Sequence, residues 1–404
     1  MGTPQRKNQL RSRIRGAIAT CVLTLALSCS RDAEVGCSPT PSCSAREDRF
    51  GPRDVADGGP DPCDDEAERC EAVAIGAGAL HTCAIARAGE VVCWGSDAEG
   101  QRGDGTQVEP SVDAGVLGRF SVVLEHARRL AVGRAHTCAL TEDGVVWCWG
   151  RNAEGQVTGE PSESPIASPR LVTGIGAATE IDAGDAHTCA VVEDGVVCWG
   201  DARFGQSGGA VGDAPQRPGL VDGTSGAIAV AAGSRHSCAA FGSGRVACWG
   251  ERLGPDGAPD ARATAQWIEG LDDVTAVSAG AGHTCAIRAG GRLVCWGTNE
   301  SGQLGDGTTI SRATPVEVGD LDPILAVSCG GGTRDGVTVG HTCAVDSGFF
   351  VQCWGRNREG QLGIGSAQDA TTRQTVRERP DRDDEELYMD DAVAIAAGAF
   401  HACA

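Results

Sequence analysis

Short apolar runs alternate with Gly-rich turns along this chain from about residue 71 to its end, and the period of the runs fits β-strands. The clearest unit lies between His136 and Gly150. In its first strand, alternate side chains would point to opposite faces, so that His136 and Cys138 share one face. Glu142-Asp143-Gly144 supplies a turn with a residue that accepts a positive φ, and Val-Val-Trp-Cys-Trp supplies the return strand. The pattern predicts a β-hairpin with His-x-Cys on one strand and Cys-Trp-Gly on the other, which we call the cassette.

The cassette recurs along the chain. Its His-x-Cys half occurs seven times, at spacings of 47 to 60 residues, beginning at His81, His136, His187, His236, His283, His341 and His401. Its Cys-Trp-Gly half occurs six times, beginning at Cys93, Cys148, Cys198, Cys248, Cys295 and Cys353. A small, Gly-rich apolar run precedes each histidine, for example EIDAGDA before His187, and predicts a further buried strand. Units of this length with three or four short strands are typical of an all-β fold, the β-propeller.

The repeated motifs resemble those of the regulator of chromosome condensation repeat family, in the bacterial variant whose hairpin carries two cysteines. The resemblance rests on the His-Thr-Cys-Ala and Gly-Val-x-Cys-Trp-Gly runs and on Gly-Gln-Leu-Gly-Asp-Gly-Thr, which is seen in full from Gly302 to Thr308. It covers about Ala72 to Ala404. It implies a propeller of about seven blades, each a four-stranded antiparallel sheet.

The last copy of the cassette has only its first half, because the chain ends at His401-Ala402-Cys403-Ala404. We therefore expect the last blade to be incomplete and favour a fragment or a truncated reading frame. Strands lent by the N-terminal segment and an open ring are the alternatives. An incomplete blade would leave a strand edge exposed. Cys329 and Cys403 would then be the odd cysteines, and their pairing stays open.

The first residues have the pattern of an export signal. A basic region, Arg6 to Arg15, precedes an apolar run from Ala17 to Leu27 that is too short to span a bilayer comfortably. Leu25-Ala26-Leu27-Ser28-Cys29 resembles a bacterial lipoprotein signal with Cys29 as the lipidated residue, although Ala26 stands where that pattern usually has leucine. We predict a signal peptide over 1–28 and an extracytoplasmic protein, either lipid-anchored through Cys29 in the cell envelope or secreted.

The composition adds two constraints. The formal charge of −21 would become −26 with the loss of the five basic leader residues, which argues against nucleic-acid backbones and anionic membranes as partners. Only 4% of the residues are aromatic, which suits thin repeated layers better than one large core. Residues 29–70 lack apolar periodicity and are interpreted as a linker before the propeller at 71–404. Its acidic run DVADGGPDPCDD resembles a degraded calcium-binding repeat, but a solvated spacer is the favoured interpretation.

The cysteine positions predict disulfides. Cys138 and Cys148 lie at equal distances from the turn centre, so they face each other across the hairpin at a Cα separation that a disulfide accepts. Oxidation is also expected in an exported chain. We therefore predict six disulfides, Cys83–Cys93, Cys138–Cys148, Cys189–Cys198, Cys238–Cys248, Cys285–Cys295 and Cys343–Cys353, each stabilising the fold by roughly 2–3 kcal/mol. The pairing of Cys37, Cys43, Cys63 and Cys70 stays open.

Other chemistry for the cassette is less favoured. A histidine and two cysteines could bind a metal, but each repeat offers only three ligands with no fourth nearby. A Cys-His pair that recurs in every repeat indicates a structural role rather than a catalytic dyad. We expect no metal, no cofactor and no catalytic residue. The six cassette tryptophans, on the face opposite the cysteines, should pack between blades. His126 is interpreted as a surface residue, and Trp267 as a mark of the first strand of the next blade.

Function should therefore depend on what lies between the cassettes. The sixth repeat has an insertion before His341, which we interpret as a loop on one rim; Thr333, Arg334 and Asp335 are the candidate binding residues. We expect a non-enzymatic scaffold that binds an unidentified protein partner through rim loops. The alternatives are a propeller hydrolase or lyase acting on an envelope polymer, which needs a cluster of carboxylates or histidines that breaks the repeat, and a nucleotide-exchange regulator, which rests on the family resemblance alone.

Overall fold

The computed structural model describes residues 72–107, 122–212, 215–254, 257–334, 337–376, 389 and 392–404. These residues form 26 β-strands, and within them no helix is long and apolar enough to cross a membrane. The predicted leader, the linker and the lipidation site at Cys29 lie outside the described residues.

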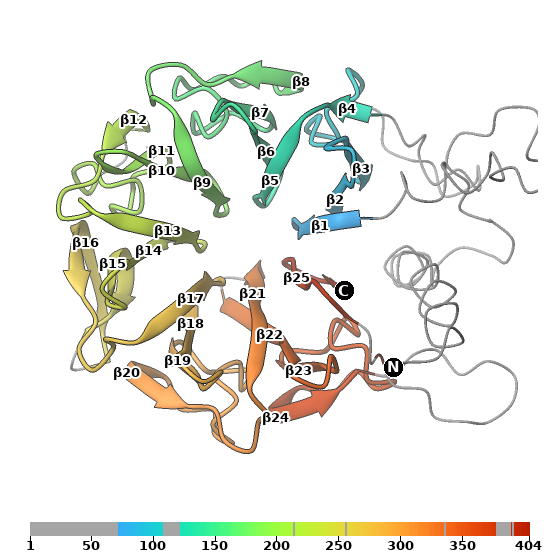
Figure 1. The fold of residues 1–404 in the computed structure, drawn as a ribbon, viewed down its shortest axis with the longest axis vertical. Coiled ribbons are helices and arrows are strands. Elements are labelled where there is room, and N and C mark those ends of the chain that lie inside the picture. The colour runs from blue at the N-terminus through green and yellow to red at the C-terminus, as the bar shows by residue number, and fades with distance from the viewer. Residues whose placement is uncertain are drawn as a thin grey trace, which may run out of the picture.

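The strands form six four-stranded antiparallel sheets, here called blades 1 to 6, arranged radially around a centre (Figure 1). The first three blades are β1 (Ala72–Ala77), β2 (His81–Ala86), β3 (Val91–Gly95) and β4 (Val122–Leu124); β5 (Ala127–Val132), β6 (His136–Thr141), β7 (Val146–Gly150) and β8 (Ile166–Leu171); and β9 (Ala178–Ala183), β10 (His187–Val192), β11 (Gly195–Gly200) and β12 (Gln216–Leu220). The next three are β13 (Ala227–Ala232), β14 (His236–Phe241), β15 (Val246–Leu253) and β16 (Pro259–Trp267); β17 (Val274–Ala279), β18 (His283–Arg288), β19 (Leu293–Gly297) and β20 (Arg312–Glu317); and β21 (Ile324–Arg334), β22 (Val337–Asp346), β23 (Val351–Gly355) and β24 (Ala370–Thr375).

The expected number of about seven four-stranded blades is wrong, whereas the all-β propeller fold is confirmed. After blade 6 the described chain forms a two-stranded sheet of β25 (Ala396–Ala397) and β26 (Ala402–Cys403). The prediction counted the His-x-Cys halves, but a blade also needs the return strand that Cys-Trp-Gly supplies, and that half occurs six times. The two-stranded sheet lies in the ring between blade 6 and blade 1, and β25 contacts both β21 and β1 (Figure 1).

The cassette forms the second and third strands of every blade. Its two cysteines are directly opposite in the strand register, as for Cys138 and Cys148, and their Cα atoms are 4.0–4.1 Å apart in all six copies. The predicted disulfide-bonded hairpins are confirmed: the six described bonds are Cys83–Cys93, Cys138–Cys148, Cys189–Cys198, Cys238–Cys248, Cys285–Cys295 and Cys343–Cys353.

The core consists of layers between neighbouring blades. Cys138 and Leu140 of blade 2 share one buried cluster with Ile181 and Trp199 of blade 3, whereas Trp149 packs on the other side, against blade 1. The six cassette tryptophans are between 0% and 7% exposed, so the prediction that they pack between blades is confirmed. Apolar burial at these interfaces, at about 25 cal/mol per Å², therefore replaces the single large core that the low aromatic content excludes.

A ring of hydrogen bonds between buried side chains links the blades. The Nε2 atoms of six of the seven cassette histidines lie 2.8–3.0 Å from a threonine or serine hydroxyl of the next blade. In blade 2 the Thr137 hydroxyl donates to the backbone carbonyl of Gln101, as does the Trp149 indole. The hydroxyl therefore accepts from His81, which places the proton of that histidine on Nε2. The pairs are His81–Thr137, His136–Thr188, His187–Ser237, His236–Thr284, His283–Thr342 and His401–Thr82.

The ring of hydrogen bonds is interrupted at one junction. By position His341 should pair with residue 402, which is alanine, and neither ring nitrogen of His341 has a hydrogen-bond partner. Ala402→Thr should supply the missing hydroxyl and raise the free energy of unfolding by about 1 kcal/mol. Chemical denaturation will measure the change, with Ala402→Val as the control of equal shape. Equal stability of the two variants would show that the hydroxyl does not complete the ring.

The centre of the propeller is lined by a glycine ring, which consists of Gly78, Gly133, Gly184, Gly233, Gly280, Gly330 and Gly398. A Cβ atom on any of them would lie only 2.0–2.8 Å from the carbonyl oxygen of the next glycine in the ring. The last step is from Gly398 back to Gly78, and the Ala399 amide also donates to the Gly78 carbonyl. The innermost strands therefore close a seven-membered ring, although six sheets of the described part of the chain have four strands.

Blade 4 departs from the pattern on its outer side. It lacks the Gly-Gln turn, and β15 and β16 instead continue as a long hairpin up to the pair Leu253 and Pro259. Trp267 ends β16, so its interpretation as the first strand of the next blade is wrong: it belongs to the fourth strand of blade 4. It is 43% exposed and packs against Phe241 and beneath the guanidinium of Arg245.

Candidate interaction surface

The antiparallel order of the strands puts equivalent connections on the same side of the disc. We call the side that carries the connections from first to second and from third to fourth strands the upper face, and the opposite side the lower face. Outside blade 6, the upper-face connections include the two residues between each ring glycine and the cassette histidine, such as Arg134 and Asp185. These positions differ from blade to blade, whereas the glycine and histidine beside them repeat.

The predicted insertion in blade 6 is a hairpin rather than a rim loop. β21 and β22 are prolonged, with Thr333 paired to Thr338 and Arg334 to Val337, whereas Asp335 lies outside the described residues. The hairpin starts at the central channel: Cys329, Gly330 and Gly331 line it. The expected rim position is therefore corrected to the channel mouth, and a binding role for Thr333, Arg334 and Asp335 stays a prediction.

The channel itself is small, with a volume of about 60 Å³, and its lining consists largely of glycine, alanine and backbone. Arg134 of blade 2 reaches towards the hairpin of blade 6, because a Cβ atom on Gly332 would lie 3.7 Å from its Nη1 atom. A partner would therefore meet the prolonged hairpin and Arg134 together at the upper mouth of the channel.

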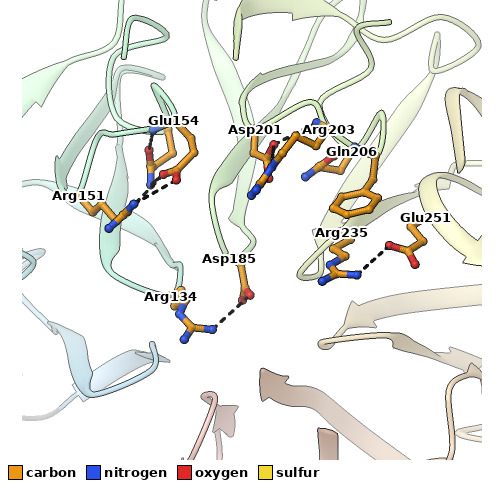
Figure 2. Close-up of polar contacts among 11 residues, drawn as sticks. Arg134, Arg151, Glu154, Asp185, Asp201, Arg203, Gln206, Arg235 and Glu251 are labelled. Carbon is orange, nitrogen blue, oxygen red and sulfur yellow. Dashed lines mark hydrogen bonds and ion pairs between the residues drawn. The ribbon is translucent and has the colours of Figure 1, made fainter. Parts of the chain in front are cut away.

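The charged side chains of the upper face form ion pairs across blades 2 to 4 (Figure 2). Arg134 of blade 2 lies 3.6 Å from Asp185 of blade 3. Burial raises the pKa of Asp185, and the positive charge of Arg134 and a hydrogen bond from Ser234 oppose that rise. Asp182, three residues earlier in β9, accepts the Ala232 amide at 2.8 Å, and burial raises its pKa to about 6.

Further from the channel, the ion pairs are more exposed. Arg235 lies 3.2 Å from Glu251 and 4.6 Å from the centre of the Phe204 ring (Figure 2). Arg151 lies 3.1 Å from Glu154 and 3.5 Å from Glu99 of the preceding blade. Both arginine side chains are about 40% exposed. Exposed ion pairs of this kind contribute only about 0–1 kcal/mol each to stability. Little stability is therefore lost if a bound protein replaces them with ion pairs of its own.

Two further features lie on the lower face. One is the Arg245–Trp267–Phe241 stack of blade 4. The other is a cavity of 690 Å³ at blades 1 and 2, lined by Glu125, Glu142, Asp143, Trp147 and others. His126 lies at this cavity, exposed and with a φ of 60°, so its interpretation as a surface residue is confirmed. The Thr141 hydroxyl lowers the pKa of Asp143, which therefore remains a carboxylate.

The cassette residues are buried, and most of their polar groups are held in structural contacts. The seven cassette histidines are between 0% and 7% exposed, and burial lowers their pKa to about 3 or 4. They are therefore neutral at pH 7, and six of the seven hold a hydroxyl of the neighbouring blade. The twelve cassette cysteines are joined in disulfides.

The two cysteines expected to be odd have different states. Cys329 is a buried free thiol, as predicted. Cys403 is disulfide-bonded, so the expectation that it lacks a partner is wrong; that partner lies outside the described residues. Cys37, Cys43, Cys63 and Cys70 are outside them as well.

Comparison with known proteins agrees with this architecture. A family model described as the RCC1-like domain matches residues 28–334. The chain belongs to the RCC1-like domain family. Its repeats are 33% identical over 139 residues to human "Probable E3 ubiquitin-protein ligase HERC4", and 32% identical over 148 residues to the "Ultraviolet-B receptor UVR8" of Arabidopsis thaliana. These alignments cover 34% and 36% of this chain, and 13% and 32% of the two relatives.

Solved structures of the same fold cover most of the chain. Human WBSCR16 superposes with a TM-score of 0.67 at 21% identity, over 82% of this chain and 86% of that one. Prp20p of Saccharomyces cerevisiae superposes with a TM-score of 0.63 at 19% identity, over 83% and 81%. At these identities the likeness shows the fold alone. The ligase activity in the name of HERC4 belongs to a protein of which this chain matches about an eighth.

The residues that form the upper-face surface were not singled out from the sequence. Arg134, Asp185 and Arg235 lie in the short segments that precede the cassette histidines, where the pattern indicated only apolar strands. The signal that could have found them is variation: charged residues occupy positions where other repeats have alanine, leucine or glycine.

Proposed function

We propose that the protein is a non-enzymatic interaction scaffold that binds a protein partner on its upper face, at the channel mouth of blades 2 to 4 and the β21–β22 hairpin. The observation that carries the proposal is the position of the variable charged residues. Arg134, Asp185 and Arg235 are gathered on one face, whereas the repeated cassette residues are buried in hydrogen bonds and disulfides. Variable side chains on a rigid disc are what a specific binding surface needs.

The location outside the cytoplasm, with a lipid on Cys29, is part of the same proposal. It is supported by the leader pattern and by six disulfides, which form and persist in oxidising compartments. The yeast relative Prp20 gives a precedent for protein binding by this fold, since its structures concern binding to Gsp1p and histones and a complex with Kap60. The identity of the partner here is not implied by those proteins.

Crosslinking in envelope extracts tests the proposal. The full chain should capture a discrete protein partner, and the double variant Arg134→Ala/Arg235→Ala should lose it, because both arginines lie in upper-face connections. Arg245→Ala, on the lower face, is the matched control and should retain the partner. Loss of the partner with Arg245→Ala alone would move the binding surface to the lower face. Turnover of a glycan panel without any captured protein would favour the enzyme alternative.

A further inference from the structure

One buried cluster of metal-ligating side chains breaks the symmetry of the repeats. The cluster consists of His283 and Cys285 of β18 and Cys329 of β21, whose potential ligand atoms all lie within 4.8 Å of one another. Among the described residues, this is the one group of three or more potential metal ligands that lie so close together. They are 1%, 0% and 6% exposed. Cys295 is bonded to Cys285, so its sulfur is adjacent to the cluster. Three potential ligands therefore meet at the interface between blades 5 and 6, and the sulfur of Cys295 is bonded to one of them.

The fourth ligand is specific to this interface. Cys329 pairs with Thr342 in the strand register, and the equivalent residue of blade 5, Ala279, pairs with Thr284. The corresponding positions of the other innermost strands are alanine or valine: Ala77, Val132, Ala183, Ala232 and Ala397. Each cassette by itself offers one histidine and two cysteines, which is one ligand too few for a tetrahedral site. Cys329 supplies the fourth ligand to the cassette of blade 5.

We propose that this cluster is a redox-gated zinc site, in which Cys285, Cys295, Cys329 and His283 bind one Zn²⁺ after reduction of the Cys285–Cys295 disulfide. Three cysteines and one histidine are a common ligand set of structural zinc sites. The Nδ1 atom of His283 is buried without a hydrogen-bond partner, which leaves a lone pair for a ligand.

The reaction balances in two steps. A dithiol reductant gives two electrons and two protons to the Cys285–Cys295 bond, is itself oxidised to a disulfide, and leaves two thiols. Zn²⁺ then replaces the protons of the three thiols, so three protons are released and the site carries one negative charge. The charge of the bound ion is what deprotonates the thiols.

A route for the ion is present. Cys329, Gly280 and Gly330 line the central channel, so the cluster borders a space that solvent can enter. In the oxidised state Cys285 and Cys295 are joined in the disulfide and cannot bind a metal, and blade 5 keeps the same cassette disulfide as the other blades. In the reduced state the metal would link β18, β19 and β21, and so join blade 5 to blade 6.

Metal titration of the full chain tests the proposal. After anaerobic reduction, the wild type should bind one Zn²⁺ per chain, and Co²⁺ in its place should give the visible spectrum of a tetrahedral site with sulfur ligands. Cys329→Ala should lower the affinity at least about tenfold, the lower range seen for disturbed metal sites. Because alanine occupies this position in other blades, the variant should fold, which circular dichroism of the oxidised protein will verify.

A gain-of-site variant separates this site from adventitious thiol binding. Ala279→Cys places a cysteine in the same register beside the cassette of blade 4, so the reduced variant should bind two ions. Cys189→Ser, which removes a cassette cysteine elsewhere, should still bind one. Equal binding by reduced wild type and Cys329→Ala would overturn the proposal, as would equal binding by oxidised and reduced wild type. A reduced chain that unfolds and binds no ion would overturn it too, since the site needs the folded interface.

Discussion

Below about pH 6 the propeller is expected to unfold in one steep transition, because its seven cassette histidines are folded in the neutral form. Burial lowers the pKa of His81, His187 and His283 to about 3, and that of His136, His236, His341 and His401 to about 4. In the unfolded chain each would titrate at its ordinary pKa of 6.5. The unfolded state therefore binds more protons than the folded state at every pH between these limits, and stability falls as the pH falls through that window.

The expected loss is large compared with the stability of a domain. At pH 5.5 each histidine costs about 1.4 kcal/mol, or about 10 kcal/mol for seven, whereas whole domains are stable by about 5–15 kcal/mol. Asp182 acts in the opposite direction, because its pKa is raised to about 6 and the folded state takes up its proton first. That gain is about 1 kcal/mol at pH 5.5, so the histidines decide the outcome.

Urea denaturation at a series of pH values between 8 and 5 will measure this effect. The slope of the unfolding free energy against pH should correspond to uptake of about five or six protons at pH 5.5. His136→Asn should remove about one of them. The matched control is His126→Asn, because His126 is exposed and asparagine tolerates its φ of 60°. A slope near zero in the wild type would contradict the neutral buried histidines.

Much of the fold follows from the sequence because the cassette is local. Cys138 and Cys148 are ten residues apart around a tight turn, so their register is set by the hairpin itself. The alternation along the strand also places Trp149 and Cys138 on opposite faces, and therefore against different neighbours. These features need no knowledge of distant contacts.

The rest depends on how the blades meet, which local pattern does not encode. The six copies of Cys-Trp-Gly match the six four-stranded blades, but the ring position of β25 depends on contacts with β1 and β21, which no local pattern predicts. The same applies to the site. Arg134 and Asp185 are 51 residues apart and meet only because consecutive blades pack side by side. Cys329 could be recognised as odd, but not as a neighbour of His283.

Substitution of a ring glycine is expected to have the largest effect of any single methyl group in this protein. A Cβ atom on Gly184 would lie 2.0 Å from the Gly233 carbonyl oxygen and 2.4 Å from Cε1 of His187. Both neighbours are fixed, the first in the adjacent blade and the second in its hydrogen bond to Ser237. Gly184→Ala should therefore force the two blades apart and lower the unfolding free energy by about 3 kcal/mol or more. Denaturation in urea with the disulfides intact will measure the loss.

The same substitution at Gly398 tests whether the ring is closed at the two-stranded sheet. A Cβ atom on Gly398 would lie 2.2 Å from the Gly78 carbonyl oxygen, so Gly398→Ala should be about as destabilising as Gly184→Ala if the two-stranded sheet is held firmly between blades 6 and 1. Gly319→Ala, in an exposed loop with no atom within 4 Å of the new Cβ, is the control and should change the stability little. A mild effect at Gly398 with a severe one at Gly184 would mean that the ring opens at this junction in solution. Equal effects would mean that hydrogen bonds such as the one from the Ala399 amide to Gly78 complete the seventh junction without a four-stranded blade.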